Sequence, residues 1–278
     1  MARRVLPPFL IDWLKKVWQI VTCGVTEWKY LPDGWATKDV RVRGWNIQSV
    51  PDRQLAKWPE FIRATKGVGP LGIAHEAPSL RDDDYYAHHL VMAYAYVLAL
   101  AAHRKDRLSL LDWGGGIGHY YILSQRLMPD LDIAYYCKDL LLLCEAGRQV
   151  LPQATFVERD EEVVKQRYDL VLASGSLQCS EDWKSVTRLL ASCTDRYLYV
   201  TRLPVLRRSK SFVALQRVYA YGYDTEYRSW FLNRQEFLDQ MTLLDLELVR
   251  EFIFEKHPAV TYAHEQPEIQ GFLFRNKR

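Results

Sequence analysis

The stretch LLDWGGGIGHYY, residues 110–121, decides the fold of this chain. It places Gly114, Gly116 and Gly118 between a short apolar strand and the start of a predicted helix. A sharp strand-to-helix turn needs residues that tolerate positive φ, and a ligand that touches the backbone there excludes side chains. The free N–H groups of the helix N-terminus face the polar atoms of such a ligand. The stretch therefore predicts a ligand-binding turn; the alternative is a tight turn that binds nothing.

The spacing of this turn, D-x-G-x-G-x-G from Asp112, separates it from two other glycine-rich turns. The dinucleotide pattern G-x-G-x-x-G needs glycine at the sixth position, where His119 stands. No Gly-Lys-Ser/Thr follows, which excludes a phosphate-binding P-loop. The spacing thus disfavours a nicotinamide-dependent oxidoreductase, which stays an alternative function on the same kind of sheet.

Apolar strands and helices alternate along the chain after the turn. Such alternation indicates βαβ units and a parallel sheet. A capping pair, Asn233 and Glu236, then opens a further helix. The predicted strands are 108–111, 132–137, 154–157, 168–173, 197–201, 246–254 and 270–274, and the predicted helices between them are 120–127, 140–150, 183–191 and 233–243.

The chain divides into two predicted parts. Residues 1–105 form an N-terminal cap of helices and loops, and residues 106–278 form the ligand-binding domain, with 205–232 as an insertion on the substrate side. Within the cap, residues 10–21 carry apolar side chains on one helical face. This helix either lies against a membrane surface or packs on the domain.

Composition narrows the class of protein. Hydrophobic residues make up 49% of the 278 residues, and the formal net charge of +3 gives no sign of nucleic-acid binding. Five cysteines without a C-x-x-C pair indicate reduced thiols in a cytoplasmic protein. No stretch has the length of a membrane span, and no motif for a metal is present.

The pattern at Asp112, Gly114, Gly116 and Gly118 resembles the first motif of class I S-adenosylmethionine-dependent methyltransferases, and the resemblance extends from about Leu108 to the C-terminus. It implies S-adenosylmethionine as cofactor and a Rossmann-like, mostly parallel sheet of seven strands with helices on both faces. Trp113 and the extra Gly115 depart from a typical first motif, and Lys138 could pair with the neighbouring acid.

Later landmarks follow the order of that family. Asp139, 21 positions after Gly118, matches the acid that accepts hydrogen bonds from both ribose hydroxyls, with Leu140 beside it. Asp160 matches an acid facing the adenine amino group, and Ser174 and Gly175 match a loop that borders cofactor and substrate.

Two of these assignments have alternatives. Asp139 could instead cap the following helix, a position that aspartate favours. Glu158, Glu161 or Glu162 could take the place of Asp160, or the whole run could be a solvated surface.

A narrower resemblance points to a bacterial group of methyltransferases often found among surface-polysaccharide or specialised-metabolite genes. It depends on YDLVLASGSLQ at 168–178, on 201–204, on 229–233 and on Gly271-Phe272.

Methyl transfer relies on a cofactor that carries the activated group, so the protein mainly binds and orients. An oxygen or nitrogen acceptor could also need a base near neutral pKa. The candidates for catalysis are His89, Tyr86 and His119; the alternative for each histidine is an exposed or structural role.

Basic residues cluster after the strand at 197–201. Arg202 and Arg208 could bind an anionic substrate, or the basic run could be a solvated loop face. Trp230 belongs to an aromatic run that forms either a sugar-stacking surface or core. The predicted function is methyl transfer to an oxygen or nitrogen of a small anionic or sugar-containing acceptor. The alternative from another class is an inactive methyltransferase-fold partner in an assembly.

Overall fold

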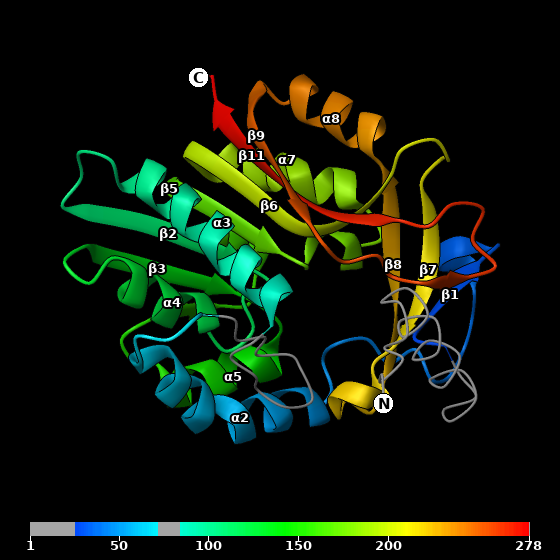
Figure 1. The fold of residues 1–278 in the computed structure, drawn as a ribbon, viewed down its shortest axis with the longest axis horizontal. Coiled ribbons are helices and arrows are strands. Elements are labelled where there is room, and N and C mark those ends of the chain that lie inside the picture. Colours follow the sequence, from blue (N-terminus) through cyan, green and yellow to red (C-terminus); the bar gives the residue numbers. More distant parts are fainter. Residues whose placement is uncertain (1–25, 72–83, 278) are drawn as a thin grey trace, which may run out of the picture.

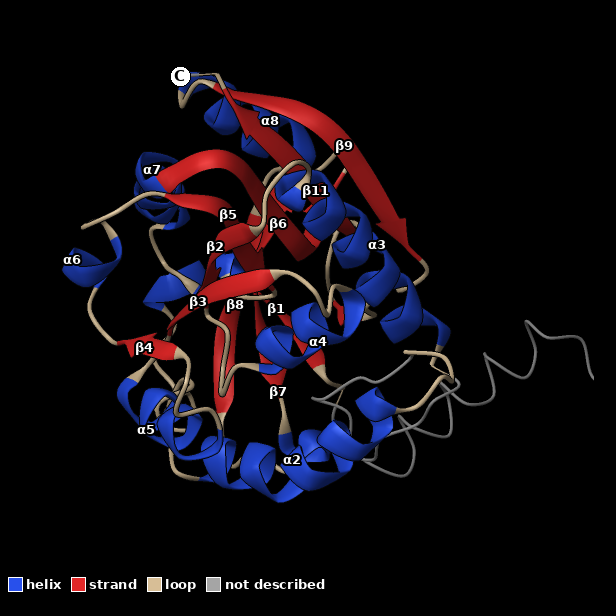
Figure 2. Cartoon of the chain, turned by 90° about the vertical axis from the view of Figure 1, so that its left-hand side faces the viewer, coloured by secondary structure: helices blue, strands red, loops and turns tan. Residues whose placement is uncertain are grey.

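A computed structural model describes residues 26–71 and 84–277, so the predicted helix at 10–21 lies outside the described residues. The described chain forms an α/β fold around one sheet of eleven strands (Figure 1). Helices cover both faces of this sheet (Figure 2).

Seven of the strands follow one another in the order β4-β3-β2-β5-β6-β11-β9. The first five pair in parallel, whereas β11 runs antiparallel to both of its neighbours. Their bounds are β2 Arg107–Trp113, β3 Asp132–Lys138, β4 Thr155–Val157, β5 Tyr168–Ser174, β6 Thr194–Leu206, β9 Leu246–Phe254 and β11 Glu268–Asn276. The strands predicted in this part of the chain are confirmed.

The central strands are apolar on both faces because each face meets a layer of helices. In β2, Leu108 and Leu110 pack into one core cluster, and Leu111 and Trp113 pack into the other. The first cluster holds residues of α2 Ser49–Lys66, α3 Tyr85–Ala102, α4 His119–Leu127 and α5 Leu141–Val150. The second holds residues of α6 Asp160–Val163, α7 Trp183–Cys193 and α8 Arg234–Leu243. Continuous apolar runs are therefore what a doubly covered parallel sheet requires.

The prediction of seven strands is wrong for the sheet as a whole, because four more strands extend it. The end of β6 pairs with β8 Glu226–Asn233, and β7 Phe212–Arg217 pairs antiparallel with β8. Next come β1 Trp28–Leu31 and the short β10 Val260–Thr261. The three-residue helices η1 Gly34–Ala36, η2 Leu177–Cys179 and η3 Tyr219–Tyr221 complete the order. Residues 205–232 thus supply a hairpin that continues the sheet.

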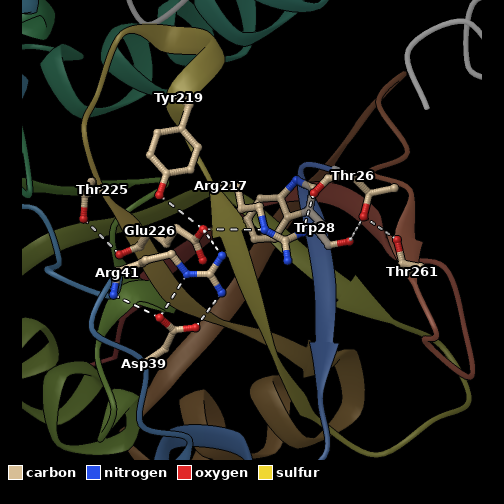
Figure 3. A network of polar contacts seen from close by, with 9 residues as sticks. All are labelled: Thr26, Trp28, Asp39, Arg41, Arg217, Tyr219, Thr225, Glu226 and Thr261. Atoms are coloured by element: carbon tan, nitrogen blue, oxygen red, sulfur yellow. Dashed lines mark hydrogen bonds and ion pairs between the residues drawn. The ribbon is translucent and has the colours of Figure 1, made fainter. Parts of the chain in front are cut away.

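A polar network ties the N-terminal segment to this hairpin (Figure 3). Glu226 is fully buried. One of its carboxylate oxygens lies 3.6 Å from a guanidinium nitrogen of Arg41 and 3.6 Å from one of Arg217. The same oxygen accepts a hydrogen bond of 3.2 Å from the Tyr219 hydroxyl. Arg41 also pairs with Asp39 at 2.7 Å. A buried carboxylate is tolerated because cations surround it.

Capping side chains set two helix starts, and the one at Asn233 is the one predicted from the sequence. The Asn233 side chain accepts from the Glu236 N–H, and the Asp84 side chain accepts from the Ala87 N–H to open α3. In the described part of the chain, no helix combines the length and apolar character needed to cross a bilayer.

Candidate functional site

Two cavities adjoin at the carboxyl ends of strands β2, β3, β5 and β6. The first, here called the turn cavity, has a volume of about 230 Å³ and surrounds the glycine turn. Its lining includes many of the predicted site residues: Asp112, Gly114, Gly116, His119, Asp139, Leu140, Ser174, Gly175 and Arg202. An edge formed by parallel strand ends is where ligands bind in open α/β sheets.

The glycine turn brings backbone to the cavity wall. Gly114, Gly116 and Gly118 all have positive φ, as the sequence predicts. A Cβ on Gly115 would lie 2.5 Å from the carboxyl carbon of Asp112. The extra glycine that departs from the usual motif is therefore required, because it lets the turn cross over a buried carboxylate.

Asp139, which directly follows the neighbouring strand β3, holds the glycine turn in place through hydrogen bonds. One carboxylate oxygen accepts from the Gly116 N–H and the other from the Leu140 N–H, both at 2.7 Å. Burial raises the pKa of Asp139, and these two N–H groups oppose that rise. Leu140, and not Asp139, occupies the N-cap position of α5, so the capping alternative is wrong.

Asp112 lies fully buried beneath the turn. Tyr135 donates its hydroxyl hydrogen bond to this carboxylate at 2.5 Å. Burial raises the pKa of Asp112 to about 7, and the nearby Asp139 charge adds to the rise. The turn cavity therefore holds two carboxylates in a setting that disfavours their charge unless a cation or donor joins them.

Two predicted cofactor residues do not line the turn cavity. Asp160 forms an ion pair with Lys138 at 3.0 Å, and its side chain is 48% exposed. Lys138 therefore pairs with this acid and not with Asp139. Gly118 faces the interior, where a Cβ would lie 2.6 Å from Leu151.

Two of the three acids that could have replaced Asp160 make contacts elsewhere. Glu158 pairs with Arg148 at 3.0 Å, and Glu162 pairs with Arg159 at 2.9 Å.

The second cavity, here called the aromatic cavity, has a volume of about 220 Å³. Strands of the added part of the sheet, the first turns of α3 and the segment before β11 enclose it. Its aromatic lining consists of Trp28, Trp45, Tyr86, Tyr120, Tyr221, Tyr223 and Tyr227, and its charged lining consists of Glu27, Asp84, Arg202 and Lys256.

Four residues line both cavities: Trp45, Tyr120, Gly175 and Arg202. We call this set the junction. The Tyr120 and Ser174 hydroxyls share a hydrogen bond of 2.9 Å. The Trp45 ring lies 4.4 Å from that of Tyr227, between centroids. A group passed between ligands in the two cavities would have to pass here.

The candidates for catalysis separate in the structure. Tyr86 lines the aromatic cavity, with Lys256 4.8 Å from its ring centroid. His119 is buried between the rings of Trp58 and Phe61, at 5.2 and 4.8 Å between centroids. His89 is exposed and lines neither cavity.

The predicted substrate residues separate as well. Arg202 lies at the junction, whereas Arg208 and Trp230 line a shallow cavity beside Trp183 and Lys210. Trp230 donates its indole N–H to the Glu181 carbonyl at 2.9 Å. The sequence cluster of basic residues therefore does not form one site.

Sequence reasoning did not single out Tyr120 or Trp45 as functional. Tyr120 could have been found, because it lies in the first turn of the helix that follows the glycines. No local signal marks Trp45. Across residues 26–71 and 84–277, no group of three or more His, Cys, Asp or Glu side chains could hold a metal ion.

No family model and no curated protein matches this sequence. Solved structures do match the fold. A protein from Galdieria sulphuraria assigned as a sarcosine dimethylglycine methyltransferase superposes with a TM-score of 0.50 at 12% identity, over 81% of this chain and 98% of that one. This likeness establishes the α/β methyltransferase fold.

Two further similar structures superpose with TM-scores below 0.50. Magnesium protoporphyrin IX methyltransferase from Synechocystis PCC 6803, solved with its cofactor bound, matches at 0.47 and 16% identity over 87% of this chain and 99% of that chain. A sugar N-methyltransferase from Streptoalloteichus sp. ATCC 53650 matches at 0.45 and 13% identity over 68% and 87%.

Proposed function

We propose that this chain is an S-adenosylmethionine-dependent methyltransferase, with the cofactor in the turn cavity and the methyl acceptor in the aromatic cavity. The observation that carries this proposal is the pair of hydrogen bonds that the Asp139 carboxylate accepts from the backbone N–H groups of Gly116 and Leu140. These groups belong to the backbone wall of the turn cavity. Each carboxylate oxygen uses one lone pair in these bonds and keeps acceptor capacity for a ligand hydroxyl.

The residues of the turn cavity fit the cofactor. Asp139 would accept from the two ribose hydroxyls, with Leu140 beside the adenine. Gly114 and Gly116 would lie against the amino-acid part, and the two buried carboxylates suit a ligand with positive charges. Ser174 and Gly175 border the same space. Asp160 is outside the cavity, so its predicted contact with adenine has no support from the geometry. When bound, the cofactor supplies an activated methyl group.

The acceptor proposal follows from the aromatic cavity. Aromatic faces suit the flat or apolar side of a small molecule, and the charged side chains suit its polar groups. We therefore propose a small anionic or sugar-containing acceptor methylated on oxygen or nitrogen. Tyr86 is the one proposed catalytic residue that lines this cavity. The narrower bacterial resemblance, with its polysaccharide or specialised-metabolite role, belongs to the same proposal.

Calorimetric titration with S-adenosylmethionine and S-adenosylhomocysteine tests the cofactor. We expect micromolar binding by the wild type and a loss of tenfold or more in Asp139→Ala, since a hydrogen bond to a charged group contributes about 1.5–3 kcal/mol. Asp160→Ala is the matched control, because it removes an acid outside the cavity, and its affinity should equal that of the wild type.

Other outcomes of the titration would contradict the proposal. No binding of either cofactor form by folded wild type would remove it and favour the inactive-partner alternative. Binding of a nicotinamide dinucleotide in their place would favour the oxidoreductase.

A further inference from the structure

A β-bulge in strand β6 sets the position of Arg202. Val200 pairs with Phe272 and Leu203 pairs with Gln270, so Thr201 and Arg202 together oppose the single residue Gly271. Arg202 has φ +59°, in the left-handed region that few non-glycine residues adopt. Bulges of this kind bend a strand and re-aim a side chain, often next to a site.

Two glycines make room for this conformation. A Cβ on Gly271 would lie 3.0 Å from the Tyr199 hydroxyl and 3.1 Å from that of Thr201. A Cβ on Gly175 would lie 3.3 Å from both Cζ and Nε of the Arg202 guanidinium. The guanidinium therefore lies against Gly175 at the junction, and the surrounding backbone accommodates it there. A strained backbone conformation at a site is an observation from which function can be inferred.

The charges around the aromatic cavity are distributed unevenly. Glu27 accepts from Gln216 at 2.5 Å and from Tyr221 at 3.0 Å, and Asp84 accepts from the first turn of α3. Of the four junction residues, Arg202 alone carries a permanent charge, and it is positive.

We propose that Arg202 binds an oxyanion of the methyl acceptor at the junction, so that the acceptor is a carboxylate or a phenolate on a flat molecule. The inference depends on the proposed function, because a bound sulfonium cofactor would place a second positive charge beside the guanidinium. An anion between two cations is stabilised, whereas a neutral hydroxyl gains little. The planar guanidinium matches a carboxylate with two parallel hydrogen bonds.

The chemistry then balances without a base. The oxyanion's lone pair forms the new O–C bond to the methyl carbon, and the pair of the broken S–C bond stays on sulfur. One negative and one positive charge disappear, and no proton has to move. Arg202 is accordingly a binding residue that selects the ionised acceptor.

Binding of benzoate and benzamide to protein saturated with S-adenosylhomocysteine tests this inference, because the two probes share a ring and differ in charge. We expect the wild type to bind benzoate about tenfold more tightly than benzamide, as a charge-assisted hydrogen bond predicts. Arg202→Gln should remove this preference and leave benzamide binding within about twofold of the wild type. Arg208→Gln changes a basic residue just beyond the end of β6, outside both cavities, and should behave as wild type.

Thermal unfolding of Arg202→Gly separates a binding role from a structural one. Glycine adopts φ +59° without strain, so this variant should stay folded while losing the benzoate preference. A folded Arg202→Gly variant that keeps the benzoate preference would overturn the inference. So would equal affinity of the loaded wild type for both probes, or no benzoate binding at millimolar concentration.

Failure of the proposed function gives a different result. In that case S-adenosylhomocysteine itself would not bind, whatever the probes show.

Discussion

The turn cavity and the aromatic cavity share a junction but are built in different ways. The turn cavity comes mainly from the ends of neighbouring parallel strands, and its central contacts join the Asp139 carboxylate to backbone N–H groups. The aromatic cavity comes from side chains as far apart in sequence as Trp28 and Lys256. A site made by one local turn can be read from a motif, whereas a site made by distant side chains depends on the whole fold. The two cavities should therefore respond to different substitutions.

The largest expected effect is loss of the turn cavity in Gly115→Ala. The added Cβ would lie 2.5 Å from the buried Asp112 carboxyl carbon and 2.8 Å from the Cys137 sulfur. We expect affinity for S-adenosylhomocysteine to fall by tenfold or more, because the turn must shift to relieve overpacking of a kind that costs about 1–3 kcal/mol. Calorimetry measures the loss. Gly69→Ala is the control, since nothing lies within 4 Å of its added Cβ; an equal affinity in both variants would refute the role of Gly115.

The next effect concerns the polar network that ties the N-terminal segment to the hairpin of β7 and β8. Glu226→Gln removes the carboxylate that faces Arg41 and Arg217 and leaves the Arg217 cation, 14% exposed, without this partner. Breaking a buried pair in this way lowers the free energy of unfolding by about 3 kcal/mol. Asp39→Asn, at the outer side of Arg41, should change the free energy of unfolding far less than Glu226→Gln does, because this ion pair is exposed. Urea unfolding compares the two.

The same pair of variants tests whether the cavities are separable. S-adenosylhomocysteine affinity should stay at the wild-type value in folded Glu226→Gln, because its substitution lies away from the turn. A large loss of affinity would show that the hairpin strands and the turn cavity form one unit.

A smaller effect is expected from pH. The pKa of Asp112 is about 7 in the folded protein, against an ordinary value near 3.8 in the unfolded chain, because burial disfavours the charge. The folded state therefore keeps a proton that the unfolded state has released. This stabilisation is complete below the unfolded pKa and is lost as pH rises through about 7.

Between pH 6 and pH 7 the free energy of unfolding of the ligand-free wild type should fall by about 1 kcal/mol from this group. Asp112→Asn cannot ionise, so its free energy of unfolding should lack this fall between pH 6 and pH 7. Asp160→Asn, at the surface, should show the same fall as the wild type. Urea titrations at both pH values give the comparison, and parallel slopes for wild type and Asp112→Asn would contradict it.

The smallest effect is expected at the junction. Trp45→Phe reduces the aromatic surface that lies 4.4 Å from Tyr227, and such a pair contributes about 1 kcal/mol. Benzoate affinity of the loaded protein should fall about fivefold, with a lesser change for S-adenosylhomocysteine. Trp35→Phe, in contact with Trp230 and lining neither cavity, should leave both affinities unchanged.

The sequence predicted well wherever structure depends on local backbone. The glycine turn and the strand alternation follow from steric and periodic rules that act over a few residues, whereas Asp139 was assigned through the family resemblance. The cap at Asn233 follows the same kind of rule and is confirmed. Asp160 failed to reach the turn cavity because Lys138 holds it in a surface ion pair, a competition between charges that spacing does not reveal.

By itself, then, the sequence determined the class of fold and the place of the turn. The turn depends on contacts within one strand–turn–helix unit, and the class of fold is visible in the alternation of strands and helices along the chain. Only the tertiary structure decided the four added strands, the junction residue Trp45, and which arginine reaches the site. Arg202 and Arg208 look alike in sequence, but Arg202 lies in a bulge opposite Gly271, whereas Arg208 follows the end of the strand. The direction of a side chain depends on strand register, and register depends on partners distant in the chain.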